Sequence, residues 1–157
     1  MSAGAGTGAR RLFAGGYTDG SGRDGISTIA FDVGRGAARV VRTDGCAPNP
    51  TYLARRGSFL YAAHELDEYG RMASYAIAAD GSLACRGACT APFDAGTCFV
   101  LPDPNGRSLY GANYLSGSVG CCALLEDGRL VAGLPSRRHE GRGLRDDRQE
   151  APHVHSL

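Results

Sequence analysis

Some residue types and patterns are missing from this chain, and each absence narrows what it can be. The 157 residues include no tryptophan and no lysine, so all 17 basic residues are arginine. Acidic residues nearly balance them, and a formal net charge of +1 favours neither nucleic acid nor an anionic membrane as a partner. No apolar run has the length of a signal-peptide core or of a bilayer crossing. The length and these absences predict one cytoplasmic domain.

A CxxC pair is also missing, although the chain has six cysteines. They lie at Cys46, Cys85, Cys89, Cys98, Cys121 and Cys122. Adjacent residues of a strand point to opposite faces, so Cys121 and Cys122 would chelate a metal poorly. We expect reduced thiols of a cytoplasmic protein, most of them buried as small apolar side chains. The cysteines therefore predict neither a metal site nor a cofactor.

Glycine is abundant, with 24 residues spread along the chain, which indicates many turns. Short runs rich in Val, Ile, Leu, Phe and Tyr lie between the glycines, as is typical of short strands. No window of a dozen residues keeps apolar positions at helical spacing without a glycine. The sequence predicts an all-β protein.

The strand-like runs recur at a fixed interval. Leu12, Leu60 and Leu109 stand at the same place in similar segments, with spacings of 48 and 49 residues. Those segments are RLFAGGYT (11–18), SFLYAAHEL (58–66) and RSLYGANYL (107–115). The strands expected next also match across the three units, at 25–32, 71–78 and 118–125. Asp-Gly turns follow in the second and third units, within 79–83 and 126–130.

A four-stranded unit with a period near 47 residues predicts β-propeller blades, because known blade repeats span about 40–50 residues. The alternative is an all-β sandwich with accidental similarity between its strands. A closed propeller needs about four to eight blades, whereas this sequence supplies about three. We therefore expect residues 1–10 to be a flexible lead-in and 11–157 to be the N-terminal blades of a longer propeller. Its open blade edge could allow self-association.

Four stretches resemble the seven-bladed propeller lactonases of the bacterial 6-phosphogluconolactonase type, a family that includes the fungal carboxymuconate-lactonizing enzymes. They are FAGGYTDGSGRDGISTIAFD (13–32), NPTYLARRGSFLYAAHEL (49–66), LPDPNGRSLYGANYLSGSVG (101–120) and RQEAPHVHSL (148–157). The combination of ANYLSGSV with RQEAPHVHS is the specific element. The resemblance covers nearly all of this chain but only the first half or less of a typical member.

The resemblance implies a site in the central channel of the propeller. It places Arg148, His153 and His155 there as catalytic residues, with Arg148 also binding the substrate. Gln149, Glu65 and Asn113 are the further substrate-binding residues that it implies. Two positions depart from the family pattern. His64 stands before Glu65 where members commonly have Asn, and Phe99 follows Cys98 where many have His.

The chemistry of the tail fits this assignment. Opening a lactone needs a base for water and a donor for the oxyanion, which suits histidine, whose pKa lies near neutrality, and arginine. On a strand, His153 and His155 would project from one face with Val154 on the other. Two alternatives stay open from the spacing alone: both histidines could lie in solvent, or they could bind a metal together with His64 and Glu65.

The sequence thus predicts a sugar-lactone hydrolase, with 6-phosphogluconolactone as the favoured substrate and no cofactor. The alternatives are a muconate-type lactonizing cycloisomerase of the same family and a non-catalytic propeller platform, although the lack of tryptophan removes the WD repeat pattern. Nucleic acid is not expected, because acidic residues interleave the arginines of the 129–150 segment and aromatic residues are lacking there. We expect the 157-residue chain alone to be inactive, since later blades complete the channel wall.

Overall fold

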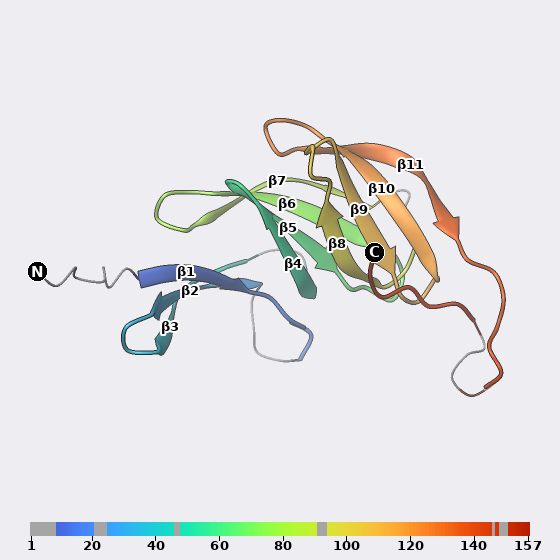
Figure 1. Ribbon diagram of the computed structural model, residues 1–157, viewed down its shortest axis with the longest axis horizontal. Coiled ribbons are helices and arrows are strands. Elements are labelled where there is room, and N and C mark those ends of the chain that lie inside the picture. The colour runs from blue at the N-terminus through green and yellow to red at the C-terminus, as the bar shows by residue number, and fades with distance from the viewer. Residues whose placement is uncertain (1–8, 21–24, 46–47, 91–93, 146, 148–150) are drawn as a thin grey trace, which may run out of the picture.

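The computed structural model describes residues 9–20, 25–45, 48–90, 94–145, 147 and 151–157 (Figure 1). In this part of the chain the regular structure consists of strands in three antiparallel sheets, each built from strands that follow one another along the sequence. The first sheet contains β1 (Ala9–Ala14), β2 (Ile26–Asp32) and β3 (Ala37–Asp44). The second contains β4 (Pro50–Arg56), β5 (Phe59–His64), β6 (Arg71–Ile77) and β7 (Leu83–Cys89). The third contains β8 (Thr97–Pro102), β9 (Ser108–Asn113), β10 (Ser118–Leu124) and β11 (Leu130–Arg138).

These sheets are the predicted propeller blades, and we call them blades 1, 2 and 3. The three leucines of the repeat occupy the same register position, Leu12 opposite Ile29, Leu60 opposite Tyr75 and Leu109 opposite Cys122. Figure 1 shows blade 1 beside blade 2, and blade 2 packed against blade 3. The alternative of one sandwich is therefore wrong.

Blade 1 differs from the four-stranded expectation. Its β1 corresponds to β5 and β9, so among the described residues it has no counterpart of the first strands β4 and β8. The strand β1 begins at Ala9, two residues before the predicted start of the blades at Arg11, because Ala9 and Arg10 pair with Asp32 and Phe31.

The hydrophobic core lies on both faces of blade 2. Successive side chains of a strand point to opposite faces, and β5 buries both sets. Leu60 and Ala62 pack towards blade 1 in a cluster with Ile26, whereas Tyr61 and Ala63 pack towards blade 3. A strand buried on both faces explains why FLYAAH has no alternating polar positions.

The Asp-Gly turns form as predicted. Gly81 and Gly128 adopt φ of 90° and 82°, a region that favours glycine. The Asp80 carboxylate accepts hydrogen bonds from the backbone and the hydroxyl of Ser82 at 2.9 and 2.7 Å. The Asp127 carboxylate accepts one from the Arg129 backbone at 3.1 Å. Each aspartate thus closes its own hairpin by satisfying donors that the turn leaves open.

The cysteine expectation is partly wrong. Among the five cysteines that the structure describes, only Cys89 and Cys122 are buried, in the core between blades 2 and 3. Cys85 is exposed, because β7 lies at the edge of its blade. Cys121 and Cys122 do face opposite sides of β10, as their adjacency predicted. Within the described ranges, no residue belongs to a helix of the length and apolarity that a bilayer crossing requires.

Candidate active site at one end of the blades

One position of the repeat recurs at the same end of all three blades. Tyr17, Glu65 and Tyr114 each stand five residues after the repeat leucine. Glu65 and Tyr114 directly follow β5 and β9, and Tyr17 lies just beyond β1. The contacts described below join Tyr17 to Glu65, and join Tyr114 and Cys98 to the tail at 151–157. We call this group, with Cys98, His153 and His155, the channel-end cluster.

Tyr17 and Glu65 form a pair that bridges blades 1 and 2. A hydrogen bond with the Glu65 carboxylate, with burial and the charge of Glu65 adding to it, raises the pKa of Tyr17 to about 12. The phenol therefore stays protonated at neutral pH and donates its O–H to the carboxylate. Tyr17 is 52% exposed, so the pair stands at a surface that a ligand can reach.

Asn49 holds the segments that carry Tyr17 and Glu65 next to each other. Its side-chain oxygen accepts hydrogen bonds from the backbone and hydroxyl of Thr18, at 2.9 and 3.3 Å, and its amide nitrogen donates to the Glu65 carbonyl at 3.1 Å. Its own carbonyl accepts from the Glu65 backbone at 2.9 Å. Asn49 has a φ of 52°, a left-handed conformation that asparagine tolerates better than most residues. We call these bonds the Asn49 clasp.

Tyr114 holds both histidines of the tail. Its ring stacks on His153, with centroids 4.4 Å apart and planes at 20°, and meets His155 at 4.7 Å and 53°. His153 Nδ1 lies 3.0 Å from the Tyr114 carbonyl oxygen. A carbonyl can only accept, so Nδ1 carries the proton, and the lone pair of the neutral ring is on Nε2.

The prediction that the tail is a strand is wrong. Residues 152–157 form no strand, because no neighbouring strand among the described residues pairs with their backbone. The two histidine rings nevertheless meet the same aromatic ring, as the expectation of a shared face required. The Cys98 thiol lies 3.5 and 3.7 Å from the carbonyl oxygens of Val154 and His155. The tail thus lies beside β8, much as β8 lies beside β4 (Figure 1).

Cys98 joins the two halves of the cluster. Burial raises the pKa of its thiol, and the nearby charge of Glu65 raises it further. The thiol is therefore neutral at physiological pH, which makes it a poor nucleophile. Cys98 thus contacts the tail at 154–155 and feels the charge of Glu65 on the neighbouring blade.

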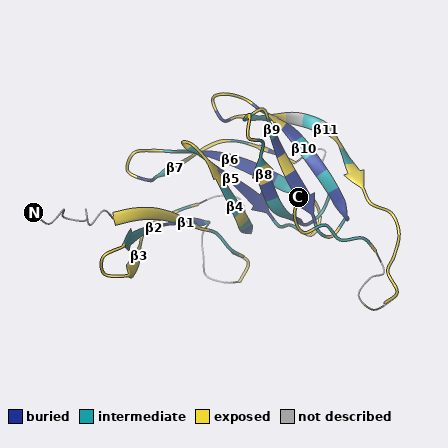
Figure 2. Cartoon of the chain, in the orientation of Figure 1, coloured by how far each residue is buried: buried dark blue, intermediate teal, exposed yellow. Residues whose placement is uncertain are grey.

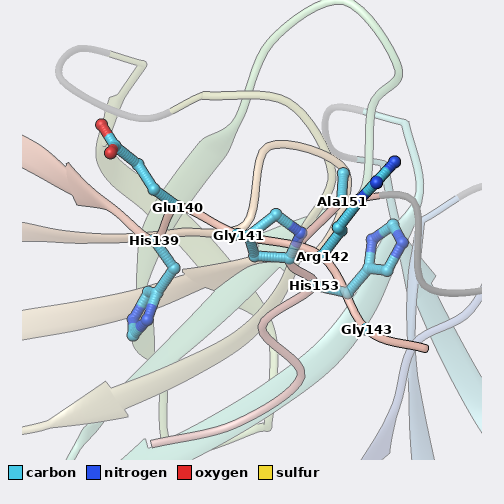
Figure 3. A pocket seen from close by; sticks show the side chains of 8 residues that line it. His139, Glu140, Gly141, Arg142, Gly143, Ala151 and His153 are labelled. Atoms are coloured by element: carbon cyan, nitrogen blue, oxygen red, sulfur yellow. The ribbon is translucent and has the colours of Figure 1, made fainter.

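A pocket of about 470 Å³ opens next to His153. Figure 3 shows the Arg142 side chain beside the His153 ring, with the Glu140 carboxylate pointing away on the other side. The two segments that line the pocket, at 139–143 and 151–153, both contact Gly117. The backbone of His139 donates to the Gly117 carbonyl at 2.9 Å, and the Pro152 carbonyl lies where a Gly117 Cβ would be. The pocket is lined by His139, Glu140, Gly141, Arg142, Gly143, Ala151, Pro152 and His153.

Asn113 and His64 lie one residue before Tyr114 and Glu65, and both are completely buried. The Asn113 side chain accepts a hydrogen bond from Thr97 at 2.7 Å and donates one to Ser118 at 3.0 Å. His64 Nδ1 donates to the Pro48 carbonyl at 2.7 Å. These bonds support the strand ends that carry Tyr114 and Glu65. Direct substrate contact by Asn113 stays a prediction.

The remaining predicted residues, Arg148 and Gln149, lie outside the described residues. His153, His155 and Glu65 come together in the cluster. In the described part of the chain, no three His, Cys, Asp or Glu residues are close enough to hold a metal ion. Sequence reasoning missed Tyr17, Asn49 and Tyr114, although aligning the repeat would have placed Tyr17 and Tyr114 in the same column as Glu65.

Comparison with known proteins gives a consistent result. The family model described as "Lactonase, 7-bladed beta-propeller" matches residues 11–157. The 6-phosphogluconolactonase of Bacillus subtilis is 30% identical over 148 residues, which cover 91% of this chain and 41% of that protein. An uncharacterized protein of Staphylococcus saprophyticus is 30% identical over 146 residues, or 92% of this chain and 42% of its own length.

The solved structures agree in fold and in coverage. The periplasmic gluconolactonase of Pseudomonas aeruginosa superposes with a TM-score of 0.84 at 28% identity, covering 93% of this chain and 43% of that one. The chain therefore spans about two-fifths of the length of the relatives that it matches. The blades, their order and the family match together place this chain in the seven-bladed β-propeller lactonase family.

Proposed function

We propose that this chain forms part of a sugar-lactone hydrolase that acts on 6-phosphogluconolactone, with His153 as the base. The observation that carries the proposal is the fixed position of the His153 imidazole. Its Nδ1–H donates a hydrogen bond to the Tyr114 carbonyl, and its ring stacks on the Tyr114 ring. The names of the relatives from Bacillus subtilis and Pseudomonas aeruginosa support the lactone as substrate class.

The proposed reaction begins when His153 Nε2 takes a proton from water. The oxygen of that water bonds to the lactone carbonyl carbon, and the carbonyl oxygen becomes an oxyanion. Return of the carbonyl breaks the bond to the ring oxygen, which takes the proton from His153 and leaves as a hydroxyl group. All atoms of water and lactone appear in the open hydroxy acid, and the imidazole returns to its starting state. A base placed in this way contributes about 10²–10⁴-fold to the rate.

The other predicted residues have roles around this centre. Arg148 would hold the oxyanion or the phosphate through its planar guanidinium, with Gln149 beside it. Glu65 binds the sugar from the opposite side of the cluster, and Asn113 supports Tyr114. His155, which is exposed and tilted against Tyr114, would orient the substrate rather than act as the base.

A cytoplasmic location is part of the proposal. It is supported by the five described cysteines, which are in the thiol form and fit a reducing compartment. Fractionation of cells that express the protein with a reporter checks it. Recovery of the reporter outside the cytoplasm, where the Pseudomonas aeruginosa relative is named as residing, would contradict it.

The test compares the 157-residue chain with a seven-bladed protein that contains these residues. The seven-bladed protein is expected to open 6-phosphogluconolactone well above the spontaneous rate, measured by acid release at constant pH. The 157-residue chain is expected to stay at the spontaneous rate, because blades beyond it complete the channel wall. Hydrolysis at the spontaneous rate by both proteins would overturn the proposed function.

A further inference from the structure

The pair formed by Tyr17 and Glu65 has no part in the proposed proton transfer, yet the Asn49 clasp holds it in place. Glu65 directly follows β5, and Tyr114, which stacks on His153, directly follows β9 at the equivalent repeat position, so the pair lies at the same end of the blades as His153. Glu65 is half-buried and Tyr17 is exposed, so both can meet a ligand.

We propose that Tyr17 and Glu65 form a subsite that binds neighbouring hydroxyl groups of the sugar lactone and thereby selects polyhydroxylated lactones. This inference rests on the proposed function, since it assumes that a lactone ring lies at this end of the blades. It adds the part of the substrate that the pair recognises and a role for Tyr17.

The hydrogen-bonding capacity of the pair fits hydroxyl groups. An ionised carboxylate only accepts hydrogen bonds and offers about four lone-pair sites on its two oxygens. Tyr17 occupies one of these sites with its O–H. Hydroxyl groups on adjacent carbons of the lactone ring can donate to the remaining lone-pair sites of the Glu65 carboxylate. Hydrogen bonds to a charged acceptor are roughly twice as strong as hydrogen bonds between neutral groups. The Tyr17 oxygen can accept a further hydroxyl.

The surroundings keep Glu65 in one position before any ligand arrives. The Asn49 clasp bonds to both the carbonyl and the backbone N–H of Glu65, at 3.1 and 2.9 Å. The same clasp bonds to Thr18, the residue next to Tyr17. A preorganised acceptor loses less conformational entropy on binding than a mobile one. Tyr17 thus acts as a positioning residue for the Glu65 carboxylate.

The charge of the pair also determines what it rejects. A second carboxylate placed beside Glu65 would be repelled, and like charges across a binding surface select against the wrong partner. The subsite therefore disfavours polycarboxylate substrates such as muconates at this position.

Binding of two uncharged lactams to the 157-residue chain tests the subsite without any chemistry. Glucono-1,5-lactam carries the ring hydroxyls, whereas δ-valerolactam has the same ring without them, and neither is hydrolysed under the conditions used. In titrations followed by NMR, the wild-type chain is expected to bind the hydroxylated lactam at least about tenfold more tightly, because charged hydrogen bonds each contribute a factor of this order. The signal of the Tyr17 phenol carbon should move only with this ligand.

Variants then assign the preference to the pair. Glu65→Gln is expected to lose most of the tenfold preference, and Tyr17→Phe part of it. Glu68→Gln and Tyr69→Phe make the same chemical changes at exposed residues a few positions further along and should keep it. In Glu65→Gln the pKa of Tyr17 should also fall from about 12 towards 10, which checks that the hydrogen bond within the pair is lost.

Three results would overturn the inference: equal binding of the two lactams, no binding of the hydroxylated lactam, or an unchanged preference in Glu65→Gln. These results are independent of the proposed function. A seven-bladed protein that fails to open 6-phosphogluconolactone would overturn the function while leaving lactam binding intact. Equal binding of the two lactams would remove the subsite while leaving hydrolysis intact.

Discussion

The two blade interfaces of this chain are built in different ways. Between blades 2 and 3, the side chains of Val100, Leu109 and Cys122 are completely buried. Between blades 1 and 2 the buried contact is smaller and centres on Ile26. The other face of blade 1 is open, with Leu12 45% and Val40 60% exposed, and every residue of β3 except the last is exposed. Figure 2 shows the buried residues gathered in the central strands of blades 2 and 3 and few in blade 1.

The difference shows that similar repeat units need not be equally stable. In the described residues, blade 1 has no counterpart of β4 and β8, the strands that carry much of the contact between blades 2 and 3. Blade 1 is joined to blade 2 by a small apolar cluster around Ile26 and by the polar Asn49 clasp. The Tyr17–Glu65 pair crosses this weaker junction, so the geometry of that half of the site depends on hydrogen bonds.

The largest expected effect is on the interface between blades 2 and 3. Leu109→Ala leaves a cavity at a position that is 0% exposed and should lower the free energy of unfolding by about 2–5 kcal/mol. Val40→Ala shortens a side chain that is 60% exposed and should change the free energy of unfolding by less than about 0.5 kcal/mol. Denaturant unfolding of the 157-residue chain measures both. Similar losses in the two variants would contradict the contrast between the buried interface of blades 2 and 3 and the open face of blade 1.

The second effect concerns the Asn49 clasp. Asn49→Gly keeps the left-handed backbone accessible but removes the side-chain bonds to Thr18 and Glu65, at about 0.5–1.5 kcal/mol per bond. Amide exchange in β1 and β2 should accelerate, while exchange in β9 and β10 should stay unchanged. Asn49→Asp is the matched control, because it keeps the acceptor for Thr18 and should show a smaller change. Uniform acceleration in all blades would contradict a local role for the clasp.

A third effect separates backbone strain from loss of the tail's contact. Gly117 and Gly36 both lie in hairpin turns, with φ of 61° and 63°. Alanine at either position should cost about 1–2 kcal/mol for the left-handed backbone. Only at Gly117 does the added Cβ collide with the Pro152 carbonyl, whereas nothing lies within 4 Å at Gly36. Gly117→Ala should therefore also displace His153 from Tyr114, seen as a loss of ring-current shifts, and Gly36→Ala should not.

The smallest effect is a pH dependence at the junction between blades 1 and 2. The Tyr17 pKa is raised from 10 to about 12, so the folded state favours the protonated phenol. The stabilisation from this pair is complete below pH 10 and is lost as the pH rises towards 12. Subtracting the ultraviolet titration curve of Tyr17→Phe from that of the wild-type chain isolates the signal of Tyr17 among the seven tyrosines. A midpoint near 10 would mean that the hydrogen bond to Glu65 is absent.

Much of the fold could be predicted because it is encoded locally and repeated. The spacing of Leu12, Leu60 and Leu109 placed three equivalent strands, and the Asp-Gly turns placed the hairpins. The repeat did not reveal that blade 1 has three strands in the described residues, because strand number depends on partners that a local pattern does not specify. The tail was wrongly predicted as a strand for the same reason, since alternating histidines do not supply a neighbour.

The site was predictable only in part. The resemblance marks His153, His155 and Glu65; the structure brings the two histidines together at Tyr114, and the roles of all three stay predictions. Tyr17 and Asn49 were missed, because their importance arises from contacts between blades 1 and 2 that are distant in sequence. The role of Tyr114 as the support of both histidines could not follow from its residue type. Spacing alone also gave no reason to prefer either histidine as the base.

The most direct test of the account is the effect of each histidine on catalysis in a seven-bladed protein that contains these residues. His153→Ala is expected to lower kcat for 6-phosphogluconolactone by about 10²–10⁴-fold, as removal of a general base does. His155→Ala should act mainly on KM. Unchanged kcat in His153→Ala, measured by acid release at constant pH, would contradict the assignment of the Tyr114-bound imidazole as the base.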